Sequence, residues 1–109
     1  MADDPQQKMA RVARAVAQGR YRYTRHGAEQ RIARGVERHE IEEAIASGEI
    51  IEDYPQHHYG PACLTLGRTA RGRALHVLCS VRAMVDIITV YEPDRNEWED
   101  DLRTRRQDL

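Results

Sequence analysis

The chain has 109 residues, of which 40% are hydrophobic and 32% are charged, a balance that suits one domain with a single core and excludes a disordered chain. No apolar run approaches the roughly 18 residues of a membrane-spanning helix, and the first residues lack the apolar stretch of a secretory signal. We therefore expect a cytoplasmic protein without membrane contact, in which Cys63 and Cys79 are free, buried thiols.

The net charge of −1 conceals a segregation of charge along the chain. Residues 1–38 and 61–91 carry net charges of +5 and +3, whereas residues 39–60 and 92–109 carry −6 and −3. Sixteen of the 17 basic residues are arginine, whose planar guanidinium makes bidentate contacts with phosphate. A GC-rich genome would also raise the arginine content, but it would not explain the segregation.

The first half of the chain is predicted to be mainly helical. Apolar residues at helical spacing predict three helices, at residues 5–18, 25–34 and 38–47. Gly19 is typical of the residue that follows a helix, and Thr24 is a good cap for the start of the second helix. Between them, the alternating Arg20–Thr24 segment (RYRYT) predicts a short edge strand.

The second half is predicted to form strands. These cover residues 49–54 and 62–68, followed by the two arms of a hairpin within Gly72–Tyr91. The first arm alternates apolar residues with others, the period of a half-buried strand. The second arm, Asp86–Tyr91, is nearly all β-branched or aromatic, as expected of an interior strand. Residues 95–106, a mainly polar stretch that includes Trp98, are expected to be helical.

These elements predict an α+β fold, with an antiparallel sheet of four to five strands and two or three helices packed on one face. We assign residues 1–19 to an N-terminal helical appendage and residues 20–109 to a single domain.

Several short blocks of the sequence, taken together and in this order along the chain, have a known counterpart. They are His26 with Arg31 and Arg34-Gly35, GEIIEDYP (Gly48–Pro55), GPACLTLG (Gly60–Gly67), GRALHVL (Gly72–Leu78) and IITVYEPD (Ile87–Asp94). Through these blocks, the chain from about Arg20 to Arg106 resembles the bacterial family known as domain of unknown function 4258. It departs from that family at Ala74, where members often have proline, and at Glu37-Arg38, where a serine helix cap is common.

Members of this family are often encoded beside a zinc-finger antitoxin, and the family is distantly similar to the BrnT and RelE-like toxins. Those toxins cut RNA without a metal on a small antiparallel sheet. The resemblance therefore implies a RelE/BrnT toxin-like fold, a metal-independent endoribonuclease of a toxin–antitoxin system, and an antitoxin protein, RNA or the ribosome as partners.

Cleavage of RNA without a metal requires a base for the 2′-hydroxyl, an acid for the leaving 5′-oxygen and cations around the phosphate. His76 is the first candidate for acid or base, because histidine titrates near neutrality and this one lies on a rigid strand. The alternative is a core histidine bonded to a cross-strand neighbour such as Thr65. His26, in the first turn of a helix, is the second candidate; the alternative is a residue that fixes the strand–helix turn.

The remaining candidates are a tyrosine and several arginines. Tyr91 ends the interior strand, where its phenol can stack on a base or donate a proton, or can be a core residue with a solvated hydroxyl. Arg31 and Arg34 lie three positions apart on one helix and would clamp a phosphate, or would pair with the acidic residues 40–43 of the following helix. Further RNA or phosphate contacts are expected from Arg68, Arg73 and Arg22, for which the alternative is a solvated surface.

Two adjacent histidines, His57 and His58, do not predict a metal site, because neighbouring side chains diverge in an extended loop and no second ligand pair has metal-binding spacing. We expect neither a metal nor another cofactor.

The competing hypothesis is a non-catalytic interaction module that holds a partner protein by its sheet edge or basic helix. Catalysis predicts that His26, His76 and the arginines converge in one cleft, whereas a module allows them to scatter or to lie buried in unrelated hydrogen bonds. Acidic residues 40–53 and the acidic C-terminal tail would contact a basic antitoxin, and the RYRYT edge would pair with a second copy in a homodimer.

Overall fold

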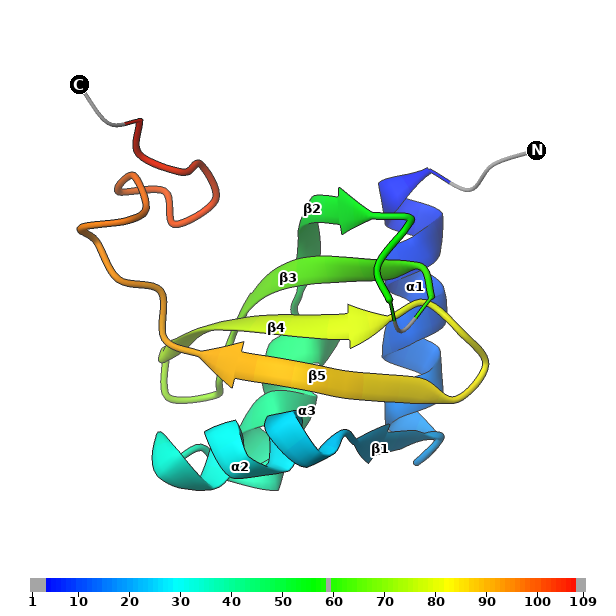
Figure 1. The fold of residues 1–109 in the computed structure, drawn as a ribbon. Helices are drawn as coiled ribbons and strands as arrows, with labels where there is room; N and C mark the ends of the chain where they lie inside the picture. Colours follow the sequence, from blue (N-terminus) through cyan, green and yellow to red (C-terminus); the bar gives the residue numbers. More distant parts are fainter. Residues whose placement is uncertain (1–3, 59, 108–109) are drawn as a thin grey trace.

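The computed structural model describes residues 4–58 and 60–107. Along the chain, the helices and strands are α1 (Pro5–Ala17), β1 (Tyr21–Tyr23), α2 (Arg25–Ala33), α3 (Arg38–Ala46), β2 (Glu49–Tyr54), β3 (Ala62–Arg68), β4 (Ala74–Ser80) and β5 (Val85–Tyr91) (Figure 1). The predicted elements up to Tyr91 are all present; the bounds of β2 and β3 are those expected, and the other bounds differ by one or two residues at most. Thr24 caps α2 as expected, because its hydroxyl accepts the N–H of Gly27 at 3.0 Å.

The strands form one five-stranded sheet in the order β1-β5-β4-β3-β2. From β2 to β5 each strand pairs antiparallel with the next, and only β1 pairs parallel, with Tyr21 opposite Val85. The predicted hairpin of β4 and β5 and the short edge strand β1 are therefore confirmed, as is the α+β fold.

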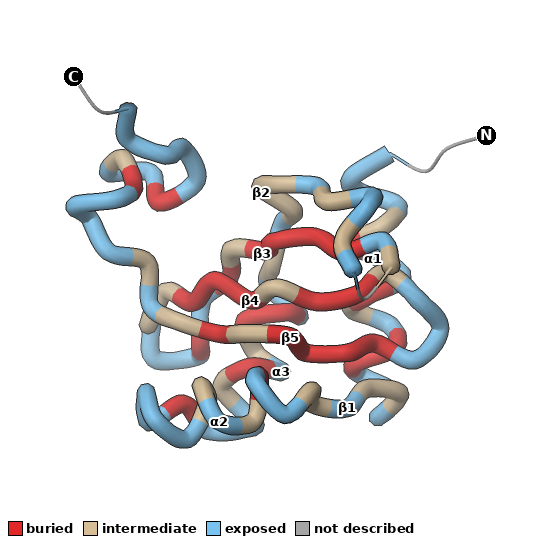
Figure 2. Tube along the Cα trace, viewed as in Figure 1, coloured by how far each residue is buried: buried red, intermediate tan, exposed pale blue. Residues whose placement is uncertain are grey.

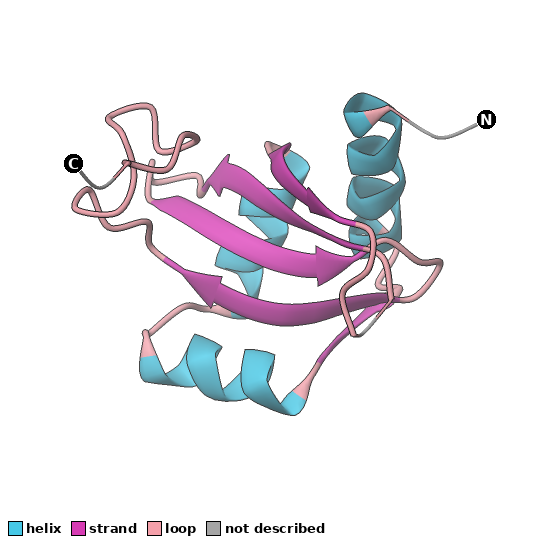
Figure 3. Cartoon of the chain, turned by 45° about the horizontal axis from the view of Figure 1, so that its top comes forward, coloured by secondary structure: helices cyan, strands magenta, loops and turns pink. Residues whose placement is uncertain are grey.

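The helices lie mainly on one side of the sheet (Figure 3). α1 and α3 cover one face, which we call the helix face, while α2 continues from β1 and runs beside β5. We expected residues 1–19 to be an appendage; within them, α1 buries Met9, Val12, Ala15 and Val16 in the same core as the sheet. Figure 2 shows that the buried stretches concentrate on β3, β4 and β5.

The alternation in β4 separates two clusters. Leu75, Val77 and Cys79 face the helices and join the main core, whereas the residues between them face the opposite side, which we call the open face. Cys63 and Cys79 lie opposite each other on the helix face, and both thiols are free and buried, with their sulfurs 3.9 Å apart.

The prediction of a helix over residues 95–106 is wrong. The C-terminal segment, residues 94–107, is a series of turns closed by a single bridge between Trp98 and Arg105. Asp101 stabilises it, because its carboxylate accepts the backbone N–H groups of Arg103 and Thr104 at 2.9 and 3.0 Å, and Leu102 adopts a left-handed backbone with φ of 60°. These local bonds compete with helix formation.

The C-terminal segment covers part of the open face. Trp98 and Leu102 are buried there and pack with Leu64 in a second, smaller cluster. The Nε1 of Trp98 has no hydrogen-bond partner among the described residues. The free energy gained by burying the large indole ring offsets the cost of removing this N–H group from water.

We predict that Gly67 of β3 tolerates no side chain. A Cβ at this position would overlap the backbone carbonyl of Ala44 in α3, so a larger residue must push α3 away from the sheet. We expect Gly67→Ala to lower the free energy of unfolding by about 3 kcal/mol, measured by urea denaturation.

Gly35→Ala is the matched control for this substitution. Its added Cβ meets open space, and only the left-handed backbone with φ of 63° is strained, at a cost of about 1 kcal/mol. Equal losses in the two variants would contradict the close contact between β3 and α3.

Candidate functional site

The open face of the sheet carries a polar network that joins β2, β4 and β5 to the C-terminal segment. Glu52 and Tyr54 alternate along β2 and project onto the same face as His76 and Tyr91, which are cross-strand partners. Arg105 reaches this face from the C-terminal segment. The network thus brings together a carboxylate, an imidazole, two phenols and a guanidinium.

Glu52 is the centre of one half of this network. Its carboxylate accepts a bidentate pair of hydrogen bonds from Arg105, with Nε 2.8 Å from Oε2 and Nη2 3.0 Å from Oε1. The Tyr54 hydroxyl donates to the same carboxylate. Burial alone would raise the pKa of Glu52, but the bonds from Arg105 and Tyr54 outweigh it, and the pKa is lowered. Glu52 is therefore ionised at neutral pH.

Arg105 is fixed from two sides. Besides its pair with Glu52, its guanidinium lies 4.6 Å from the centre of the Trp98 ring. Its side chain is nevertheless 56% exposed. The two bonds to Glu52 use Nε and Nη2, which leaves Nη1 for another acceptor.

His76 is the centre of the other half, and it is fully buried. Its Nε2 lies 2.7 Å from the carbonyl oxygen of Leu102. A carbonyl only accepts, so Nε2 carries the proton, and Nδ1 accepts from the Tyr91 hydroxyl at 3.2 Å. Burial lowers the pKa of His76 and raises that of Tyr91 to about 12, so both groups stay neutral near pH 7.

A small pocket opens between these two halves. Its volume is about 140 Å³, its floor is formed by Leu64 and Leu78, and Tyr54, His57, Tyr91 and Arg105 provide its polar walls. An apolar floor with convergent polar groups is typical of a binding site. The side chains of Arg105 and His57 are of the kinds that contact a phosphate, and the rings of Tyr54 and Tyr91 are of the kind that stacks on the face of a base.

The expectation that His26 and His76 converge in one cleft is wrong. His26 is exposed in the first turn of α2, whereas the ring of His76 is enclosed by Trp98, Tyr91 and the backbone of Leu102. His76 is a core histidine, as the alternative held, but its partners differ from the one expected. Thr65 lies on the helix face and donates to the carbonyl of Val77.

Most of the predicted phosphate-binding arginines are engaged within the fold. Arg73 pairs with Glu40 and Glu92 at 3.2 and 2.7 Å and also donates to the carbonyls of Arg34 and Gly35. It thereby ties the end of β5 to the turn between α2 and α3, and these carboxylates offset its charge.

The other predicted arginines differ in what they contact. Arg31 donates to the carbonyl of Val36, Arg68 to that of Gly72, and Arg22 pairs with Asp86. Arg34 is exposed, and its guanidinium lies 5.9 Å from the centre of the Tyr91 ring. Of the predicted cations, Arg34 is the one beside a residue of the open-face pocket.

Sequence reasoning missed Glu52, Tyr54, His57 and Arg105 as members of the site. The signal for Glu52 and Tyr54 was present, because residues two apart on a strand share a face. The pair of histidines that includes His57 suggests only a metal site from its sequence, and not a place in a polar pocket. No pattern pointed to Arg105, whose position depends on the turns of the C-terminal segment.

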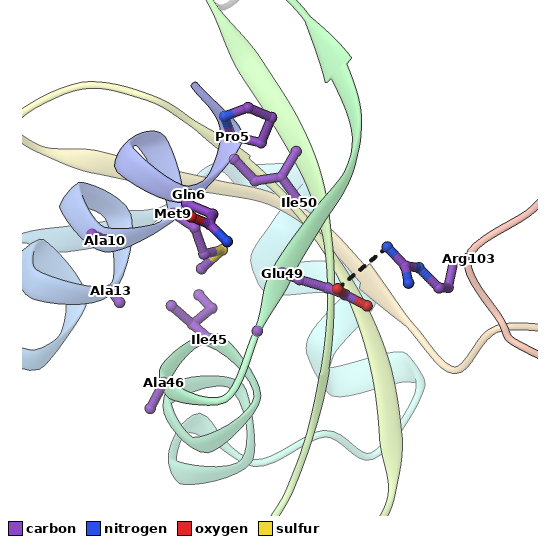
Figure 4. Close-up of a pocket in the computed structure, with 11 residues that line it drawn as sticks. Pro5, Gln6, Met9, Ala10, Ala13, Ile45, Ala46, Glu49, Ile50 and Arg103 are labelled. Carbon is purple, nitrogen blue, oxygen red and sulfur yellow. Dashed lines mark ion pairs between the residues drawn. The ribbon is translucent and has the colours of Figure 1, made fainter. Parts of the chain in front are cut away.

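A larger groove lies on the other side of β2 (Figure 4). Its volume is about 610 Å³, and Met9 and Ala13 of α1, Ile45 of α3 and Ile50 of β2 line it. Its carboxylate, that of Glu49, is paired with Arg103 at 3.4 Å. The groove is mainly apolar, and no histidine or tyrosine among the described residues lines it. Of these two pockets, the open-face pocket is the one that contains groups suited to acid–base chemistry.

These features define a class, a small α+β domain with helices on one face of its sheet and a polar pocket on the other. The chain belongs to the family described as Domain of unknown function (DUF4258), which matches residues 23–92. No curated protein and no solved structure matches the chain. Within residues 4–58 and 60–107, no helix is long and apolar enough to cross a membrane, and no His, Cys, Asp and Glu side chains are grouped as a metal site.

The buried His76 predicts a pH dependence of stability. Its pKa in the folded state lies below the unfolded value of about 6.5. As the pH falls through that value, His76 binds a proton in the unfolded chain before it does so in the folded protein. Its contribution to the free energy of unfolding is therefore fully present well above about pH 6.5 and is lost as the pH falls below it. Urea denaturation at pH 7.5 and at pH 5.0 is expected to show this loss.

The His76→Gln variant is expected to be less stable at pH 7.5 but to lose less stability between the two pH values. His39→Gln, a change at an exposed position of α3, is the control and should retain the wild-type dependence. A wild-type pH dependence in His76→Gln would show that His76 does not titrate on unfolding.

Proposed function

We propose that the open-face pocket is the active site of a metal-independent endoribonuclease. The observation that carries the proposal is the convergence of Arg105, His57 and two phenol rings on one small pocket. An arginine, an imidazole and flat aromatic surfaces are what phosphate binding, proton transfer and base stacking require. The family's resemblance to the BrnT and RelE-like toxins supports the same reaction class.

In this proposal, Arg105 holds the scissile phosphate. Glu52 orients the guanidinium through Nε and Nη2, so that Nη1 is available to a phosphate oxygen. Tyr54, held by the same carboxylate, and Tyr91, held by His76, place their rings beside the base next to that phosphate. Glu52 and His76 are thus positioning residues.

His57 acts as the base. Its imidazole takes the proton of the 2′-hydroxyl, the oxygen bonds to phosphorus, and the bond from phosphorus to the 5′-oxygen breaks. Because the pocket is open, water supplies the proton that the leaving oxygen requires. The products are a 2′,3′-cyclic phosphate and a 5′-hydroxyl end.

The proposed biological setting is cytoplasmic, with an antitoxin protein as the partner that restrains the enzyme. The acidic residues of α3 and β2 are exposed in part and offer a surface for a basic partner. Pairing of β1 with a second copy stays a prediction; β1 is an edge strand of three residues, as that pairing requires.

A non-catalytic interaction module is the second candidate function. The burial of His76 and the scatter of the predicted arginines favour it, since a module requires no convergence of these residues. Cleavage of RNA by the folded protein separates the two functions.

Purified protein is expected to cut single-stranded RNA in the presence of EDTA and to leave 2′,3′-cyclic phosphate ends. Arg105→Gln should lower the single-turnover rate by about 100-fold, because a positioned donor to the developing charge is lost. His57→Ala should lower it by about 100-fold or more, through loss of general base catalysis.

Arg95→Gln and His39→Ala are the matched controls, because these exposed residues lie outside the pocket. Both should cleave at the wild-type rate, and circular dichroism should show that all four variants are folded. Absence of cleavage by the folded wild type, or equal losses in the controls, would rule out this site and leave the interaction module.

A further inference from the structure

A second polar cavity lies on the helix side of the sheet, between α1 and the turn that joins β4 to β5. Its volume is about 370 Å³, and four arginines line it, Arg11, Arg14, Arg20 and Arg82. The other lining residues are Ala15, Val81 and Ala83, and none of the lining side chains is acidic. We call this the arginine pocket, and we propose that it binds the phosphate group of an anionic ligand.

Arg20 is held in place without losing its charge. Its Nη1 donates to the carbonyl of Ala83 at 2.6 Å, and its Nε and Nη2 donate to the side-chain oxygen of Gln18 at 3.0 and 2.8 Å. These acceptors are neutral, so they orient the guanidinium without compensating it. A pre-oriented and uncompensated arginine is what an anion site requires.

Arg82 shares its carboxylate with another arginine. Asp86 accepts from Arg82 at 2.7 Å and from Arg22 at 2.7 Å. Burial would raise the pKa of Asp86, but the two arginines lower it, so one negative charge faces two positive ones. Arg82 reaches Asp86 through Nη2, so this bond uses only part of its N–H fork.

Arg11 and Arg14 complete the pocket from α1. They lie three residues apart, on neighbouring parts of one helix surface, and both are exposed. Arg14 has no ion-pair partner among the described residues, although it lies in the last turn of α1, where the helix dipole favours a cation.

The balance of charge points to an anion. Convergence of like charges is unfavourable unless a counter-charge is present. Asp86 offsets only part of the charge of Arg82 and Arg22, and the acceptors of Arg20 are neutral. Among common ligand groups, a phosphate offers several oxygens to several guanidinium forks, and the cavity has room for a phosphate with part of its carrier. Two sources share this chemistry, the backbone of RNA and a small phosphate compound.

The inference is independent of the proposed nuclease. The arginine pocket is built from α1 and the β4–β5 turn, and it shares no lining residue with the open-face pocket. Loss of one site therefore leaves the other intact.

The test is a titration of the full chain with inorganic phosphate, and then with pyrophosphate, followed by NMR through the backbone amides of Val81 and Ala83. We expect saturable shifts of both amides. The double variant Arg11→Gln and Arg14→Gln should bind at least about tenfold more weakly, because two charge-assisted contacts are removed. Both positions are exposed, so the fold should persist, which thermal denaturation checks.

The charge-matched control is the double variant Arg71→Gln and Arg95→Gln, at exposed positions outside the arginine pocket. Its affinity for phosphate should change by less than about twofold, as expected of screened surface charges. Absence of saturable binding to the wild type, or equal weakening in the two double variants, would overturn the proposal.

A labelled 2′-O-methyl RNA oligonucleotide, which cannot be cleaved, identifies the source of the phosphate. If the source is RNA, the Arg11/Arg14 double variant should also bind the oligonucleotide more weakly and with a smaller salt dependence than the control. If the Arg11/Arg14 double variant binds phosphate more weakly but binds the oligonucleotide as the control does, the ligand is a small phosphate compound. Either result supports the site. If the Arg11/Arg14 double variant binds both phosphate and the oligonucleotide as the control does, the site is refuted.

Discussion

The hydrogen bond between His76 and the carbonyl of Leu102 determines how the open face is built. It joins β4 to a residue 26 positions further along the chain, at 2.7 Å and away from water. Because Leu102 is held, Trp98 is buried against the imidazole, and the Trp98–Arg105 bridge carries Arg105 to Glu52. The second nitrogen of His76 fixes Tyr91. The walls of the open-face pocket thus depend on one buried, neutral imidazole.

The segregation of charge in the sequence becomes pairing across the fold. Three carboxylates within residues 39–60 form ion pairs with basic residues from three separate parts of the chain. Asp53 pairs with Lys8, Glu40 with Arg73 and Glu52 with Arg105. A basic stretch of sequence is therefore no guide to a free basic surface. What distinguishes an arginine that is available to a ligand is its acceptor. Arg73 is bound by two carboxylates, whereas Arg20 is bound by an amide and a carbonyl.

Local pattern was enough to predict most of the fold. The alternation of β4, the β-branched run of β5 and the Thr24 cap each follow from interactions between residues close in sequence or from the period of a strand. The C-terminal segment could not be predicted, because Asp101 and the left-handed Leu102 replace helical bonds with turns, and because its burial depends on a sheet face formed elsewhere. For the same reason, the sequence identified Tyr91 and His76 but not the partners that decide their roles.

The pairing of Arg105 also bears on how the proposed active site would work. With its charge offset by Glu52, Arg105 holds a ground-state phosphate diester less strongly than a lone arginine would. As the 2′-oxygen adds to phosphorus, negative charge builds on the phosphate oxygens, and Nη1, which Glu52 does not bind, then faces a stronger acceptor. An interaction that strengthens in the transition state accelerates the reaction, whereas one that is equally strong in the substrate complex only tightens binding. In the proposed active site, the Glu52–Arg105 pair is therefore better suited to catalysis than a lone arginine would be, whereas Arg20, whose acceptors are neutral, is better suited to binding.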